Sequence, residues 1–125
     1  MSKAFILLAM IFCHIVDDYY LQQGLLSSLK QKSWWTKQEQ YTDKYRYDYI
    51  VALGMHAFSW SFMIMLPIAI ANGFELSVLF AAVFGVNAIV HGFVDDLKAN
   101  KLKINLVQDQ AIHILQIMIT AMILV

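Results

Sequence analysis

The sequence predicts an all-α integral membrane protein, a four-transmembrane-helix bundle with a long cytoplasmic loop between its first two helices. The chain has 125 residues, of which 60% are hydrophobic and only 14% charged, whereas a soluble domain usually carries about a quarter charged residues. Apolar runs recur at the length of roughly 20 helical residues that a bilayer core of about 30 Å requires. Because the chain contains one proline and five glycines, a turn-rich β-protein is disfavoured. We therefore expect a single transmembrane domain over residues 1–125.

The four expected spans follow one another along most of the chain. They cover about 4–21, 49–71, 75–97 and 104–125. In the first span, His14 and Asp18 interrupt the region where a signal peptide would be cleaved, so we expect a retained helix. The second has Pro67 near its end, and Asn72-Gly73 predicts a tight turn into the third. Helices are favoured throughout because every backbone polar group in lipid must be bonded within its own segment.

Basic residues are distributed unevenly between the two sides of the membrane. All of them except Lys3 lie in the connections that follow the first and third spans. Loops rich in lysine and arginine stay on the cytoplasmic side. We therefore expect a multi-pass protein of the inner (cytoplasmic) membrane, with both of these loops in the cytoplasm and both termini outside.

The first loop, residues 22–48, and the start of the next span combine aromatic side chains with lysines. The aromatic residues are Trp34, Trp35, Tyr41, Tyr45, Tyr47 and Tyr49. Tryptophan and tyrosine prefer the membrane interface, which favours an interfacial belt or a helix lying on the surface. The alternative is a lid over a site, or an aromatic platform for a ligand.

Histidine, aspartate and glutamine side chains gather at one end of every expected span. They are His14, Asp18 and Gln22 in the first, His56 in the second, His91 and Asp95 in the third, and Asp109, Gln110 and His113 in the fourth. Three His/Asp pairs have the i, i+4 spacing that places both side chains on one face of a helix. Because consecutive spans run antiparallel, these groups should form one layer within roughly 15 Å of the cytoplasmic surface.

Such a layer has the chemistry of a metal site. Imidazole nitrogens and carboxylate oxygens are ligands for zinc, manganese and iron. The candidate ligands are His14, Asp18, His56, His91, Asp95, Asp109 and His113. They exceed what one tetrahedral ion requires, so we expect two divalent ions, or one ion with supporting residues and a general base. A lone histidine in a membrane helix is more often a hydrogen-bonded packing residue, but packing explains three such pairs at one depth poorly.

Other features of the sequence restrict its partners. The net charge is formally zero, so no field attracts nucleic acid, and we expect no nucleic-acid partner. Cys13 is the single cysteine, which excludes an intramolecular disulfide and a cysteine-based metal site. The lipid bilayer is the first expected partner, and a homo-oligomer is a further expectation.

The motifs on the four spans resemble those of a family of small bacterial and phage-encoded integral-membrane proteins of unknown function. The pattern is H-x-x-x-D-x-x-x-Q at His14, Asp18 and Gln22, a histidine at His56, H-x-x-x-D at His91 and Asp95, and D-Q-x-x-H at Asp109, Gln110 and His113. The resemblance covers nearly the whole chain, apart from the first loop. More distantly, the layout is similar to the membrane-bound metal-dependent hydrolases, which implies hydrolase chemistry by analogy.

Three functions compete on these grounds. The first is a metal-dependent hydrolase that acts on a phospholipid headgroup or a phosphorylated cytosolic molecule, with Asp18, Asp95 or Asp109 in catalysis and Lys98, Gln22 and Gln110 on the substrate. The second is a structural or interaction protein, in which a metal or a hydrogen-bond network only staples the bundle. The third is an ion or proton transporter, which the apolar outer halves of the spans disfavour because conduction needs a polar or wet path.

Overall fold

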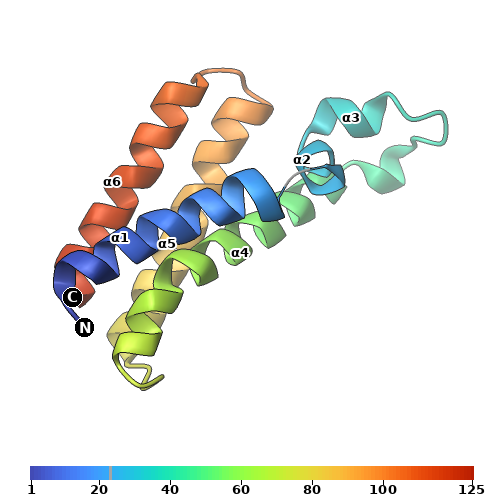
Figure 1. Ribbon diagram of the computed structural model, residues 1–125. Helices are drawn as coiled ribbons and strands as arrows, with labels where there is room; N and C mark the ends of the chain where they lie inside the picture. Colours follow the sequence, from blue (N-terminus) through green and yellow to red (C-terminus); the bar gives the residue numbers. More distant parts are fainter. Residues whose placement is uncertain (23) are drawn as a thin grey trace.

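The computed structural model describes residues 1–22 and 24–125, and its described part contains helices and no strand (Figure 1). The six α-helices are α1 (Lys3–Val16), α2 (Leu25–Leu29), α3 (Lys32–Thr36), α4 (Asp48–Ala71), α5 (Val78–Ala99) and α6 (Leu106–Leu124). A π-helical turn, η1 (Asp17–Leu21), continues α1, and a 3₁₀ turn, η2 (Asp43–Tyr45), precedes α4. Four segments are long and apolar enough to cross a membrane: α1 with η1, α4 with the turns before it, α5 and α6. The all-α prediction and its four apolar helices are confirmed.

Polar caps fix where the long helices begin. The Ser77 hydroxyl accepts a hydrogen bond from the backbone N–H of Phe80 at 3.0 Å, so α5 begins later than the expected residue 75. Asn105 and Gln108 form a reciprocal capping box, which sets the start of α6. Such caps satisfy backbone donors that have no partner within the helix.

The apolar core lies near the end of the molecule that carries the two termini. Its fully buried or nearly buried members are Ile6, Met10, Trp60, Ile64, Met65, Ile68 and Ile117. They come from α1, α4 and α6, and the last residues of α6 pack against the same cluster, which places the termini close together (Figure 1). On the outside, α1, α5 and α6 expose large apolar side chains such as Phe12, Val86 and Met122. This pattern suits helices surrounded by lipid.

The end of the first span departs from α-helical geometry. The N–H of Gln22 donates to the carbonyl of Asp17 at 2.9 Å, the i to i+5 bond of a π turn. An α-helix would have placed Gln22 on the face of His14 and Asp18, as the spacing predicted. The wider turn instead brings the Gln22 amide to the Asp17 carboxylate, at 3.1 Å, and buries Asp17 completely.

The first loop folds into short helices at the far end of α4 from the termini (Figure 1). Asn100, at the end of α5, holds its backbone: its side-chain oxygen accepts from the N–H of Lys32 at 2.6 Å, and its amide donates to the carbonyl of Lys30 at 3.0 Å. Trp35 donates to the carbonyl of Leu29 at 2.7 Å, which ties α3 to α2. The loop is therefore ordered against α5; Gln23, which belongs to the predicted loop, lies outside the described residues.

Candidate metal centre

The four histidines and their aspartates meet where α1, α4, α5 and α6 approach the first loop. His14, His56, His91, Asp95, Asp109 and His113 are all buried, and the Asp18 side chain is 11% exposed. Two groups of three residues have ligand atoms that all lie within 4.8 Å of one another: Asp18, His56 and His91, and His91, Asp95 and His113. Four segments that are far apart in the sequence thus supply one compact cluster.

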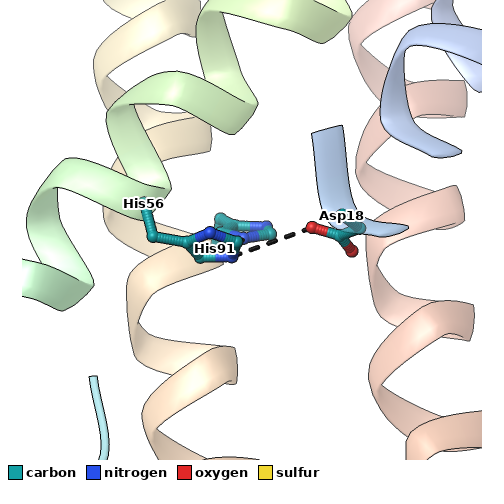
Figure 2. A group of neighbouring side chains, drawn as sticks. All are labelled: Asp18, His56 and His91. Carbon is teal, nitrogen blue, oxygen red and sulfur yellow. Dashed lines mark hydrogen bonds and ion pairs between the residues drawn. The ribbon is translucent and has the colours of Figure 1, made fainter. Parts of the chain in front are cut away.

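The first group joins η1, α4 and α5. Figure 2 shows the imidazoles of His56 and His91 lying together, with the Asp18 carboxylate facing them. The Nε2 atoms of the two histidines are 3.0 Å apart, and Nε2 of His56 is 3.7 Å from Oδ1 of Asp18. Nitrogen ligands of a tetrahedral zinc ion lie about 3.3 Å from one another. These three atoms are therefore spaced as ligands of one ion.

The second group lies beside the first, on α5 and α6. Nε2 of His113 is 3.5 Å from Oδ1 of Asp95 and 3.2 Å from Oδ1 of Asp109. Oδ2 of Asp95 lies 2.8 Å from Nε2 of His56 and 3.8 Å from Nε2 of His91. Because a single imidazole nitrogen binds one ion, either one ion draws ligands from both groups, or two neighbouring ions bind and this nitrogen of His91 belongs to one of them.

The tautomer of His113 follows from its neighbours. The Gln116 amide lies 3.2 Å from the backbone carbonyl of Asn87, an obligate acceptor, so its NH₂ must face that carbonyl. The side-chain oxygen of Gln116 then faces Nδ1 of His113 at 3.2 Å, and this nitrogen carries the proton. Nε2 of His113 consequently presents a lone pair to the carboxylates of Asp95 and Asp109. Lone pairs repel one another, so the arrangement calls for a cation, either a second proton on the ring or a metal ion.

Unpartnered atoms lie around the same point. Nε2 of His113, Oδ1 of Asp109 and Oδ1 of Asp18 are buried and have no hydrogen-bond partner within the described ranges. Buried polar atoms are almost always satisfied in folded proteins. These three are nitrogen and oxygen ligands of the type that a divalent ion accepts, so the residues present fit such an ion.

Trp60 is a residue that the sequence reasoning missed. Its ring stacks on His91 with centroids 4.2 Å apart, and His91 stacks on His113 at 4.1 Å. Stacking thus holds the His91 ring, whose Nδ1 makes no hydrogen bond within the described part of the chain. Trp60 lies four residues after His56, the same spacing that identified the His/Asp pairs, so its position on that face was a usable signal.

His14 lies beside the ligand groups and belongs to neither. The indole N–H of Trp60 donates to Nδ1 of His14 at 2.8 Å, and Nε2 of His14 faces the side-chain oxygen of Gln110 at 2.9 Å. The Gln110 amide donates in turn to Asp18 at 3.2 Å and to Asp109 at 3.0 Å. Both ring nitrogens of His14 are therefore engaged, and the geometry favours a positioning role for His14 over the ligand role that its spacing suggested.

A cavity of about 360 Å³ opens beside the cluster. Its lining residues include Lys98, Gln22 and Gln110, the three expected substrate-binding residues, together with Asp18 and His56. Lys98 also pairs with Asp109 at 3.1 Å. The cavity thus places polar side chains and carboxylates next to the candidate ligands.

Lys30 of α2 lines the same cavity and pairs with Asp95 at 2.8 Å. The sequence spacing between Lys30 and the histidines did not indicate this contact, because a loop residue reaches the site only through the tertiary fold.

Comparison with known proteins finds no matching family model, no matching curated protein and no matching solved structure. The resemblance to a family of unknown function and, more distantly, to membrane-bound hydrolases stays a prediction. The functional argument depends on the geometry of the cluster.

Proposed function

We propose that the chain is a four-helix transmembrane, metal-dependent hydrolase that cleaves a phosphoester at the cytosolic face of the membrane. The single observation that carries this proposal is that the buried carboxylates of Asp95 and Asp109 both face Nε2 of His113, an arrangement that calls for a cation, either a second proton on the ring or a metal ion. A metal ion supplies that cation with ligands that the surrounding helices already bring together.

The residues divide into ligands and supporting groups. His56, His91, Asp95 and His113 would hold zinc, manganese or iron, and Asp18 and Asp109 complete a second position if two ions bind. Such an ion, when bound, would polarise a phosphoryl oxygen and make water a better nucleophile. The ligand set contains nitrogen and oxygen atoms and no thiolate, so it does not distinguish among the three metals.

The chain's own residues would carry the proton and the substrate. Asp18 lines the cavity and has an unpartnered oxygen, so it is our choice for the general base. The Gln110 amide orients this carboxylate through its other oxygen. Lys98 stands at the cavity wall and would bind the phosphate of the substrate. Asp95 and Asp109, the other two carboxylates expected in catalysis, face His113 and serve better as ligands.

The membrane setting suits such a substrate. The lysine-rich connections favour a cytoplasmic position for this end of the bundle. The cavity lies near the ends of the spans. We expect it at the depth of a lipid headgroup, where a phospholipid or a phosphorylated cytosolic molecule would reach it without crossing the bilayer. The adjoining first loop would cover the site on its water-exposed side.

A structural protein is the second candidate, and one observation favours it. Lys30 and Lys98 already pair with Asp95 and Asp109, so part of the carboxylate charge is neutralised without a metal. In that case the cluster would be an ionic staple between helices. A transporter has less support, because beyond the buried polar side chains of Asn87, Gln116 and Thr120 the core consists of apolar residues of α1, α4 and α6.

Metal content separates the two candidates. We expect the detergent-purified protein to contain one or two equivalents of zinc, manganese or iron by elemental mass spectrometry. A His56→Ala, His113→Ala double variant should lose them, while a Lys37→Ala control in the exposed part of the first loop should not. If the folded wild-type protein takes up no metal even after reconstitution, the hydrolase proposal fails and the staple remains. If metal is bound, turnover of phosphomonoesters and phospholipids is the next test. Asp18→Asn should keep the ion held by His56, His91, Asp95 and His113, bind a second ion more weakly, and lose activity.

A further inference from the structure

Lys30 occupies an unusual place for a loop residue. Its ammonium lies 2.8 Å from Oδ2 of Asp95, and the Lys30 side chain is only 11% exposed. The same carboxylate oxygen lies 2.8 Å from Nε2 of His56. The ammonium therefore competes for the oxygen that, with the neighbouring imidazoles, would hold an ion.

Lys30 competes with a divalent ion that binds Oδ2 of Asp95, the oxygen that faces His56 and His91. An ion bound to Asp95 would lie about 2 Å from the carboxylate oxygen, and so within about 5 Å of the ammonium as it now stands. Charges of like sign at this separation repel strongly in a buried site, where the effective dielectric is low. Either the ion stays weakly bound or the lysine side chain moves away.

The backbone around Lys30 is held by Asn100, whereas its side chain borders a cavity. Asn100 bonds the carbonyl of Lys30 and the N–H of Lys32. A lysine side chain has a flexible four-carbon stem, and Lys30 already lines the cavity beside the cluster. Once released from Asp95, its ammonium has that cavity to enter.

We propose that Lys30 is a tethered cation that leaves Asp95 when the metal ion binds and then binds the anionic phosphate group of the substrate in the adjoining cavity. This inference rests on the proposed metal-dependent function. It makes metal binding the step that completes the anion site, because the lysine is available to the substrate only when the ion has taken over Asp95.

Lys98 does not have to leave its carboxylate when an ion binds. Its ammonium lies 3.1 Å from Oδ2 of Asp109, whereas Oδ1 of Asp109 is the atom that faces His113. An ion at His113 can therefore bind the inner oxygen while Lys98 keeps the outer one. Lys98 is also more exposed, at 29%, which indicates a residue of the cavity rim.

The first test compares metal affinity in four full-length proteins in detergent. We expect Lys30→Met to bind zinc or manganese on the order of tenfold more tightly than wild type, because no ammonium has to be displaced. Lys30→Arg keeps the charge and should resemble wild type. Lys37→Met, an exposed lysine of the same loop, is the matched control and should also resemble wild type.

The second test measures anion binding with and without the metal. Wild type should bind inorganic phosphate measurably more tightly once the metal is present, and Lys30→Met should lose most of that gain although it holds the metal well. Repeating the measurement with phosphatidic acid in mixed micelles distinguishes the sources of the phosphate. A gain for phosphatidic acid alone indicates a lipid headgroup, and a gain for free phosphate indicates a soluble ligand.

The outcomes separate this inference from the proposed function. Equal metal affinity in wild type and Lys30→Met would overturn the competition while leaving the metal site intact. Tighter metal binding in Lys30→Met with unchanged phosphate binding would overturn the second role of Lys30. No metal in any folded variant would overturn both proposals together.

Discussion

The two ends of the molecule are equally well buried and chemically opposite. Near the termini, Ile64 and Ile117 are completely inaccessible and pack among other apolar side chains. Near the first loop, His91, Asp109 and His113 are just as inaccessible. Burying polar and charged groups costs free energy unless each is paired, whereas burying apolar groups stabilises the fold directly. The apolar end therefore holds the fold together, and the polar end has a structure that stability alone does not explain.

Trp60 belongs to both ends, and replacing it should have the largest effect. It is in the apolar core, stacks on His91 and donates to His14. Trp60→Ala should cost about 3–5 kcal/mol of unfolding free energy and also weaken metal binding. Both can be measured in detergent, by chemical unfolding and by metal titration.

Trp60→Phe makes this prediction specific. Phenylalanine keeps an aromatic ring against His91 but cannot donate to His14. We expect a smaller loss of stability and retained metal binding. If Trp60→Phe loses the metal as completely as Trp60→Ala, the hydrogen bond to His14 matters more than the stack.

Ile64→Ala should damage the apolar end alone. The side chain is completely buried among apolar neighbours, so its truncation should cost about 2–5 kcal/mol of stability. Metal affinity of the folded protein should stay at the wild-type value, because Ile64 belongs to the apolar cluster, which includes none of the candidate ligands. A large change in metal affinity would show that the two ends are coupled and that their separation is too simple.

Gln116→Leu should act mainly on metal affinity, in contrast to Ile64→Ala. It removes the acceptor that holds the proton of His113 on Nδ1, and losing a residue that orients a ligand typically costs 10–100-fold in metal affinity, or about 1.4–2.7 kcal/mol. Gln116→Glu keeps an acceptor for that proton and should retain more of the affinity. Equal affinities in wild type and Gln116→Leu would contradict the assigned tautomer.

The fold and the candidate site could be predicted from the sequence to different extents. Apolar runs of spanning length gave the four helices, because hydropathy and length suffice for that inference. The i, i+4 spacing placed His91 with Asp95 and Asp109 with His113 wherever the helix is regular. It failed for Gln22, because the π turn at Asp17 changes the angle at which the following side chains leave the helix.

Other parts of the site depend on tertiary contacts that spacing does not encode. Lys30 reaches Asp95 from the first loop, and no periodic pattern connects the two. Gln116 orients His113 only because the Asn87 carbonyl on the neighbouring helix turns its amide. A sequence can therefore indicate candidate ligands, whereas the residues that orient them emerge from the packing of one helix on another.

Ser59→Ala should have the smallest effect, and it tests whether the π turn belongs to the polar end. The Ser59 hydroxyl donates to Asp17 at 2.7 Å and accepts from Gln22 at 2.6 Å, so it braces the turn that carries Asp18. Its loss should cost about 1–3 kcal/mol, since it leaves a buried carboxylate with fewer partners. Metal affinity should fall a few-fold as Asp18 loses its fixed position.

Ser61→Ala is the matched control for this change. Ser61 lies on the same helix, is completely buried and donates to the carbonyl of Phe84 at 2.9 Å, away from the candidate ligands. Its loss should cost a similar amount of stability and leave metal affinity unchanged. If both variants bind metal like wild type, the π turn only completes the helix. If Ser59→Ala alone binds the metal more weakly, the π turn helps to hold the Asp18 carboxylate toward the histidines.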